Sequence, residues 1–270
     1  MFVLSLTLAC TEYDIHNNQE KEQGVDETES VFADTAAVPV EEDTAVEDSG
    51  FEEANNEIPV AVEEMYLHTS TILYGWSSDG SIETIGQFYM ENEYPPNITD
   101  LAIDLDGNMF AVSFDGLYRV DPRDARLEFV CTLADRLVGL TFLADGRLLG
   151  AGDGIFWIEP SSCARAIFVD AGQYETSGDI VGLPDGNLYW TVVGGDDLVR
   201  IDPLDGSTEY VGSIGSSNLW GVGYFNDVLY GFSSTGSISE IDPNTAQVIN
   251  IQETSGQYWW GAASNPVHWQ

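Results

Sequence analysis

The chain has 270 residues and carries 46 Asp and Glu against 8 Lys and Arg, a formal net charge of −38 at pH 7. This length suffices for one large domain or two small ones with a buried core. A chain this acidic repels phosphate backbones and anionic lipid headgroups, which argues against nucleic-acid binding and against membrane binding through a basic patch.

The chain begins with an apolar run from Phe2 to Ala9, followed by Cys10. A run this short cannot cross about 30 Å of hydrocarbon as a helix. It is similar to the end of a bacterial lipoprotein signal peptide, in which lipid is attached to a Cys after small or apolar residues. The resemblance implies that residues 1–10 are a signal-peptide remnant, that Cys10 is lipidated, and that the protein is anchored in the bacterial cell envelope, at the outer membrane or cell surface. A cleaved ordinary signal or a buried Cys10 stays open.

Residues 11–60 are rich in Glu, Asp, Thr and Ala and show neither helical nor strand periodicity. Such a segment cannot bury enough apolar surface to offset the entropy lost on ordering. We therefore expect an acidic disordered linker. Behind a lipidated Cys10, the linker would hold a domain away from the membrane.

From about residue 61 the sequence changes to short apolar runs separated by Gly, Asp, Asn and Pro. A strand–turn–strand pattern occurs four times, at 115–130, 153–169, 196–211 and 236–251. Its turns open with Asp-Pro, or Glu-Pro in the second copy, and these prolines are 38, 43 and 40 residues apart. An apolar run and a strand precede each copy, joined by a turn such as Asp106-Gly107, whose Gly accepts a positive φ. Four strands at a period of about 40 residues indicate a β-propeller rather than a helical solenoid.

Both ends of this region hold part of a repeat. Residues 64–88 supply three strands but no opening apolar run, and residues 258–264 look like that missing run. Joining the two ends in one mixed blade closes the ring and hides both sheet edges. We predict an all-β fold, a propeller of five four-stranded blades over residues 61–270; six blades or an imperfect ring stay open.

The DG-x-LY strand and the LY-x-V/I-D-P element resemble the repeats of secreted bacterial propeller proteins, many of them lipoproteins without known activity. The resemblance covers about residues 64–264. It implies the fold and says little about chemistry, because the matched residues are turn and core positions.

Cys131 and Cys163 lie 32 residues apart in neighbouring repeats. An exported protein enters an oxidising compartment, where such a pair can join. A disulfide and two buried thiols are both open at this point.

The propeller topology places the irregular connections, such as residues 89–97 and 193–197, on one face of the ring, which we call the long-loop face. Binding residues favour long loops on a rigid scaffold, so we expect any site there. Aromatic rings beside carboxylates suit sugar binding. The candidate ligand-binding residues are Tyr94, Asp100, Tyr174, Asp179, Trp220, Trp259 and Trp260. The alternative is that these rings pack between blades and that loop acids are only solvated.

The sequence predicts no catalytic residue and no metal site. The histidines lack metal-ligand spacing, and His68 is expected to be a strand residue. The stretch 104–108 superficially resembles a calcium loop but lacks its distal Glu, so we expect a hairpin turn, with Ca²⁺ the one cofactor left open.

We therefore expect a surface-tethered, noncatalytic propeller that binds a protein or glycan partner. A five-bladed glycosidase using Asp100 and Asp179, and a purely structural envelope protein, stay open as alternatives.

Overall fold

The computed structural model describes Ile58, Ala61 and residues 65–77, 79–170, 174–194, 196–216, 218–254 and 256–266. These residues belong to one compact unit, residues 54–270. The predictions for the signal-peptide remnant, for Cys10 and for most of the acidic linker lie outside the described residues. Within the described part, no helix is both long enough and apolar enough to cross a membrane.

The described residues form five four-stranded antiparallel sheets, which are the predicted blades. Blade 1 consists of β20 (Gly261–Ser264), β1 (Met65–His68), β2 (Ile72–Trp76) and β3 (Ile82–Gln87). Blade 2 consists of β4 (Asp100–Ile103), β5 (Met109–Val112), β6 (Gly116–Val120) and β7 (Leu127–Thr132). Blade 3 consists of β8 (Gly139–Phe142), β9 (Leu148–Gly152), β10 (Gly154–Ile158) and β11 (Arg165–Asp170). Blade 4 consists of β12 (Thr176–Gly182), β13 (Leu188–Val192), β14 (Asp197–Ile201) and β15 (Thr208–Ser213). Blade 5 consists of β16 (Leu219–Phe225), β17 (Val228–Ser233), β18 (Ser237–Ile241) and β19 (Val248–Glu253).

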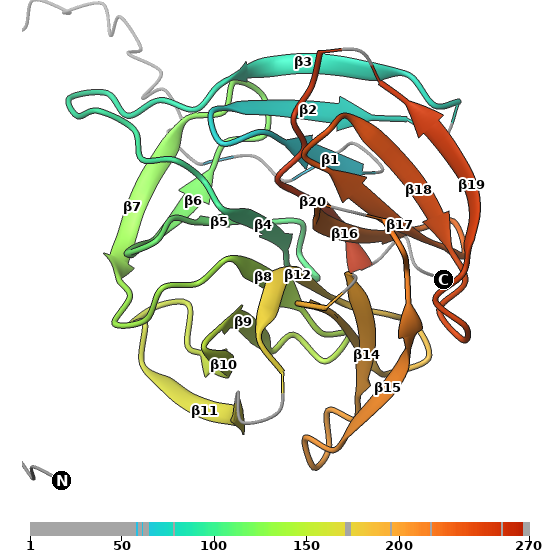
Figure 1. Ribbon diagram of the computed structural model, residues 1–270. Helices are drawn as coiled ribbons and strands as arrows, with labels where there is room; N and C mark the ends of the chain where they lie inside the picture. The colour runs from blue at the N-terminus through green and yellow to red at the C-terminus, as the bar shows by residue number, and fades with distance from the viewer. Residues whose placement is uncertain are drawn as a thin grey trace, which may run out of the picture. The chain divides into compact units, whose positions relative to one another are not determined.

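The first strands of the five blades surround the centre of the ring (Figure 1). The ring closes in blade 1, where the C-terminal β20 pairs antiparallel with the N-terminal β1, with His68 opposite Gly261 and Met65 opposite Ser264. The predicted mixed blade is therefore confirmed. Closure leaves neither β1 nor β20 as an exposed sheet edge.

The hydrophobic core is divided among the junctions between neighbouring blades. At the junction of blades 1 and 2, for example, Tyr66 and Leu73 share a buried cluster with Leu101 and Met109. Strands such as β4 and β5 are buried along their whole length, because a neighbouring blade covers each of the two faces of the sheet. Four similar clusters fill the other junctions.

Tight hairpins join the first and second strands of blades 2 to 5. Gly107, Gly146 and Gly186 each have φ of +85°, which explains the Asp-Gly pairs of the sequence. At residues 104–108, the carboxylate of Asp104 accepts the backbone N–H groups of Asp106 and Asn108. The predicted hairpin turn is confirmed at this position.

The Asp-Pro turns join the third and fourth strands and share one geometry. In each turn the backbone N–H of the residue four positions after the acid bonds back to the carbonyl of the acid. That residue has a positive φ in every copy: Ala125, Cys163, Gly206 and Ala246. The side chain of the acid accepts the N–H two residues later, as between Asp242 and Asn244.

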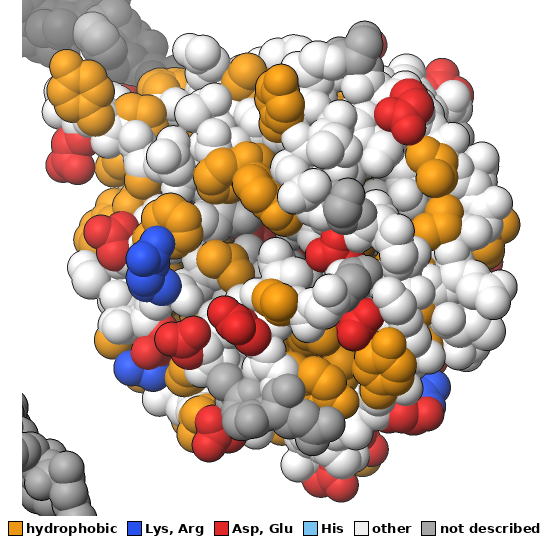
Figure 2. All heavy atoms as spheres, viewed as in Figure 1, with side chains coloured by type: hydrophobic (Ala, Val, Ile, Leu, Met, Phe, Trp, Pro, Cys, Tyr) orange, Lys and Arg blue, Asp and Glu red, His pale blue; other side chains and the backbone are white. Residues whose placement is uncertain are grey.

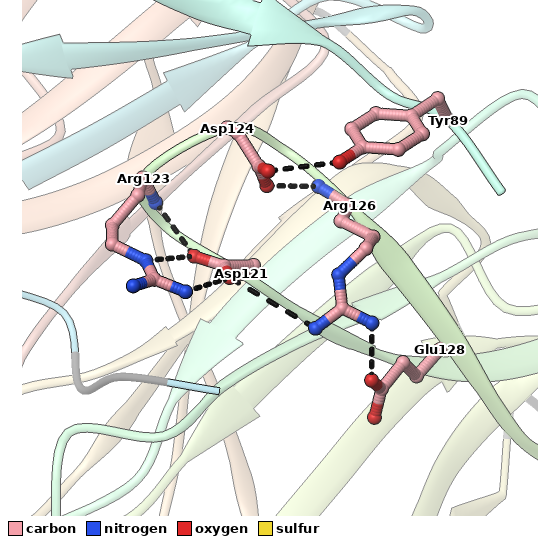
Figure 3. Close-up of polar contacts among 6 residues, drawn as sticks. All are labelled: Tyr89, Asp121, Arg123, Asp124, Arg126 and Glu128. Atoms are coloured by element: carbon pink, nitrogen blue, oxygen red, sulfur yellow. Dashed lines mark hydrogen bonds and ion pairs between the residues drawn. The ribbon is translucent and has the colours of Figure 1, made fainter. Parts of the chain in front are cut away.

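In blade 2 this turn carries an ion network (Figure 3). The carboxylate of Asp121 is 1% exposed and accepts hydrogen bonds from Arg123, at 3.0 and 2.7 Å, with Arg126 4.0 Å away. The Tyr89 hydroxyl, from the connection between β3 and β4, donates to Asp124 at 2.8 Å. The network ties the exit from blade 1 to the turn of blade 2.

The fourth strand of one blade contacts the Asp-Pro turn of the next at a recurring position. Gly86 meets Ala125, Val169 meets Gly206, and Gly212 meets Ala246 in three of these junctions. The matching pair at the junction of blades 2 and 3 is Cys131 and Cys163, which form a disulfide with their Cα atoms 6.0 Å apart. The disulfide therefore crosslinks blades 2 and 3 at the position where three other junctions have a noncovalent contact that includes a Gly.

Candidate functional site

A pocket of about 260 Å³ opens on the long-loop face at the ring axis. Three of its residues, Thr99, Val138 and Trp260, directly precede the first residues of β4, β8 and β20. The other lining residues are Phe114, Thr176, Ser177, Gly178 and Trp220. We call this cavity the axial pocket. Figure 2 shows this face, with hydrophobic and acidic side chains around the middle of the ring.

Aromatic rings form much of the wall of the axial pocket. Trp220 and Trp260 pack edge to face, with ring centroids 5.5 Å apart, and Trp220 is 37% exposed. The guanidinium of Arg136 lies 4.4 Å from the ring centre of Phe114, a geometry typical of a cation–π contact. The pocket thus presents large, partly exposed rings that are held in place by their neighbours.

Two β-bulges in the inner strands shape this end of the ring. In β12 the register shifts between Thr176 and Ile180, and in β16 it shifts between Leu219 and Gly221. The inner strands β4, β8 and β20 pair without such a shift. The extra residues include Ser177 and Trp220, and both line the pocket. Bulges re-aim side chains and are frequent beside functional sites.

Beneath the pocket floor lies a fully buried group of three titratable residues, His68, Asp100 and Asp179, which we call the axial trio. Nε2 of His68 lies 3.6 Å from Oδ1 of Asp100. The other oxygen of Asp100 accepts the backbone N–H of Leu140 on β8, at 2.5 Å. The two oxygens of Asp179 accept the N–H groups of Ile180, at 2.6 Å, and of Val222 on β16, at 2.9 Å. The two carboxyl groups therefore link inner strands of different blades.

Glycines make room for the axial trio. A Cβ added to Gly261 would lie 2.3 Å from Oδ1 of Asp100 and 2.4 Å from Nε2 of His68. At the matching positions of β8 and β16, a Cβ on Gly139 or Gly221 would meet the backbone of the neighbouring inner strand at 3.0 or 2.7 Å. The inner strands approach so closely here that two carboxyl groups fill the axis and the other three positions lack side chains.

Burial sets the protonation of the axial trio. Desolvation lowers the pKa of His68 to about 4, so its ring is neutral near pH 7. Desolvation raises the pKa of Asp179 to about 7. Desolvation, followed by the charge of Asp179, raises the pKa of Asp100 well above its usual range. Both oxygens of Asp179 accept backbone N–H groups, which favours its charged form, so Asp100 is the member that holds a proton.

The axis narrows beyond the trio to a cavity of about 10 Å³, lined by residues such as Thr141, Ala262 and Ala263. Such a volume holds about one water molecule. This small cavity and the axial pocket have no described lining residue in common.

The predicted candidates take different positions. Trp220 and Trp260 line the axial pocket, whereas Asp100 and Asp179 lie buried below it. Trp259 is fully buried in the core between blades 5 and 1, where its ring meets Tyr74 edge to face. Tyr174 packs on the edge of Trp190, and Tyr94 is fully exposed. Of the seven candidates, Trp220 and Trp260 therefore form part of the pocket wall, and Asp100 and Asp179 lie in the buried layer beneath it.

Other residues of the site were not among the candidates. These are Phe114, Ser177 and Arg136, which contacts Phe114. Loop geometry and a bulge place them at the pocket, and neither leaves a regular pattern in the sequence. His68 was expected as a strand residue, and it does end β1, but its contact with Asp100 arises only because the ring closes through β20. Among the described residues, no group of three or more His, Cys, Asp and Glu side chains is arranged to hold a metal ion.

The sequence matches no protein-family model and no curated protein. Among solved structures, the chain is similar to a symmetrical protein of de novo evolutionary emergence, with 17% identity, a TM-score of 0.53, and coverage of 74% of this chain and 97% of that chain. It is also similar to a chain of a nidogen/laminin complex, with 13% identity, a TM-score of 0.49, and coverage of 74% and 96%. A gluconolactonase from Xanthomonas campestris gives 14% identity, a TM-score of 0.49, and coverage of 71% of each chain. At these identities the likenesses concern the fold alone.

Proposed function

We propose that the protein binds a glycan in the axial pocket and does not catalyse a reaction on it. The observation that carries the proposal is the partly exposed aromatic wall formed by Phe114, Trp220 and Trp260. Aromatic rings stack on the apolar face of a sugar, and their rigid placement lowers the entropy lost on binding. The pocket volume of about 260 Å³ is just below the range of about 300–1,000 Å³ typical of drug-sized ligands, which suits one sugar unit.

The absence of catalysis in this proposal rests on the chemistry of the pocket lining. No described residue that lines the axial pocket is an Asp, Glu or His. Glycoside hydrolysis needs two carboxyl groups that reach the scissile bond. Asp100 and Asp179 are fully buried, and backbone N–H groups occupy three of their four oxygens. We assign these two residues the role of holding the inner strands together under the pocket.

A glycan array tests the proposal. The probe is the full chain carrying Cys10→Ala, so that no lipid is attached. We expect binding to a subset of glycans, at least a tenfold loss in Trp220→Ala, and no loss in Trp157→Ala, a Trp of β10 in blade 3 outside the axial pocket. Binding unaffected by Trp220→Ala, or binding to no glycan, would contradict the proposed site. Hydrolysis of a bound glycan that Asp100→Asn abolishes would instead support a glycosidase.

The proposal includes an anchor in the cell envelope. The support for it is the apolar run before Cys10 and the acidic composition of residues 11–60. Metabolic labelling with a fatty acid in a bacterial host is expected to mark the full chain and not Cys10→Ala. Label that persists in the variant would overturn the anchor and leave the binding proposal unaffected.

A further inference from the structure

A second cavity, of about 330 Å³, adjoins the axial pocket on the long-loop face. Its lining residues are Ser177, Val193, Gly194, Asp196, Gly215, Ser216 and Asn218. We call this cavity the lateral pocket. It shares Ser177 with the axial pocket, so the two form one site with an aromatic part at the axis and a polar part between blades 4 and 5.

Ser177 has the property expected of a ligand-binding group. Its hydroxyl oxygen is buried and has no hydrogen-bond partner within the described part of the chain. Most buried polar side-chain atoms are paired, because leaving one unpaired costs free energy. The bulge of β12 places Ser177 in the lining of both pockets, so a ligand that spans them can supply the missing partner.

The rest of the lateral pocket is suited to hydroxyl groups. One oxygen of Asp196 accepts the N–H of Leu219 at 3.2 Å, which fixes the carboxylate at the pocket. A carboxylate has further lone pairs that can accept hydrogen bonds from a ligand. Gly194 and Gly215, with φ of +155° and +70°, add no side chain to the cavity wall.

Charge restricts the class of ligand. From Met65 onward the chain has 28 Asp and Glu against 7 Arg, and Asp196 lines the lateral pocket. Such a surface repels anionic sugars. Neutral hydroxyl groups can donate to Asp196 and to Ser177 without a repulsive charge.

We infer that the two pockets bind one neutral oligosaccharide of at least two sugar units, with one unit against Trp220 and Trp260 and a following unit hydrogen-bonded to Ser177 and Asp196. This inference rests on the proposed function and specifies the length and charge of its ligand. The first unit is held by stacking, and the second is held by polar contacts. The bulge of β16 supplies Trp220 to the first half of the site, and the bulge of β12 supplies Ser177 to the second.

Calorimetric titration of the full chain carrying Cys10→Ala tests this inference. The probes are glucose, xylose, arabinose, mannose and galactose, their neutral linear tetramers, and a tetramer of galacturonic acid. We expect at least one neutral tetramer to bind at least tenfold more tightly than its monosaccharide, with no binding of the acidic tetramer. Asp196→Asn, confined to the lateral pocket, should weaken the neutral tetramer by about three- to tenfold and leave the monosaccharide unchanged. Ser177→Ala should weaken the neutral tetramer by a similar factor.

The controls separate the inference from the proposed function. Ser207→Ala, in the turn between β14 and β15 on the opposite face, should leave every affinity unchanged. If tetramer and monosaccharide bind equally, or the acidic tetramer binds best, the two-pocket inference is wrong, while dependence on Trp220 would keep the proposed function. If no sugar binds, both are wrong. Circular dichroism of each variant checks that a lost affinity is not lost folding.

Discussion

Nε2 of His68 and Oδ1 of Asp100 face each other across 3.6 Å at the ring axis, and neither atom has a hydrogen-bond partner among the described residues. The Nδ1–H of His68 donates to the carbonyl of Thr69 at 2.9 Å, which leaves Nε2 with a lone pair. A protonated Asp100 can direct its O–H toward this lone pair or toward Asp179. The pair is thus arranged for an uncharged Asp100.

The free energy of unfolding should fall as the pH rises from about 4 toward the raised pKa of Asp100, because of this residue. Folding raises the pKa of Asp100 well above the value of about 3.9 of an unfolded Asp, so the folded state holds a proton that the unfolded state has released. Asp179, whose pKa is raised to about 7, contributes a similar fall between about pH 4 and 7. His68, with its pKa lowered to about 4, contributes a rise between about pH 4 and 6.5, because only the unfolded state is protonated there.

Denaturant titrations between pH 4 and 9 measure this effect as the difference between the wild type and Asp100→Asn, whose amide mimics the protonated acid. We expect the wild type to lose up to about 1.4 kcal/mol per pH unit relative to Asp100→Asn until the pH passes the raised pKa of Asp100. Asp145→Asn is the control, because the Asp145 carboxylate is half exposed and its pKa is lowered by Arg147. A wild-type profile that runs parallel to that of Asp100→Asn would contradict the assignment.

Gly261→Ala should destabilise the domain through the axial trio. The added Cβ would contact buried atoms of Asp100 and His68, which have little room to move, so we expect a loss of about 3 kcal/mol, the upper part of the usual range for overpacking. Gly215→Ala is the comparison, because its Cβ meets nothing within 4 Å and only the positive φ costs about 1 kcal/mol. Equal losses in urea unfolding would show that the axis is not tightly packed.

Removal of the disulfide should weaken the domain without changing its fold. Cys131→Gly with Cys163→Ala reproduces the pair found at two other junctions, Gly86 with Ala125 and Gly212 with Ala246. A crosslink that closes about 32 residues contributes about 3–4 kcal/mol in the chain-entropy account. A reducing agent should lower the Tm of the wild type and leave that of the double variant unchanged. A wild-type Tm that does not respond to reduction would contradict a stabilising disulfide between Cys131 and Cys163.

Asp121 and Asp242, which occupy equivalent turn positions, should differ in how much they contribute to the free energy of unfolding. Both accept a backbone N–H in their turns, but only Asp121 is buried and paired with Arg123 and Arg126. We expect Asp121→Ala to cost about 2–3 kcal/mol, because it removes the turn hydrogen bond together with a buried carboxylate that pairs with two arginines, and Asp242→Ala to cost about 1 kcal/mol. Thermal unfolding of the two variants gives the comparison. A larger loss in Asp242→Ala would show that the ion network contributes nothing beyond the turn.

The sequence predicts the blades well, because each blade repeats local signals. The Asp-Gly and Asp-Pro turns recur at fixed places, and the partial repeats at the two ends lead directly to the pairing of β1 with β20. The position of Asp100, Asp179 and three glycines at the starts of the inner strands is also visible in the sequence. Its consequence, the buried trio, depends on distances across the axis and on His68 from the closing blade.

The walls of the site were harder to predict. Ser177 and Trp220 sit in bulges, where one strand gains residues relative to its partner, and a repeat-based reading assigns such positions to regular strands. Trp259 and Trp260 are adjacent in sequence, yet one is buried between blades and the other lines the pocket. Adjacent residues of an extended segment point their side chains to opposite sides. The pairing of β20 with β1 decides that Trp260, and not Trp259, lines the pocket.

Glycan binding at the ring axis is tested most directly by the indole N–H signals of the tryptophans in a two-dimensional NMR spectrum. The full chain carrying Cys10→Ala is titrated with the glycan that binds best on the array, and signals are assigned with single Trp→Phe variants. We predict that the signals of Trp220 and Trp260 shift with saturation while that of Trp157 stays in place. Shifts confined to other tryptophans, or no shift at saturating glycan, would contradict the axial site.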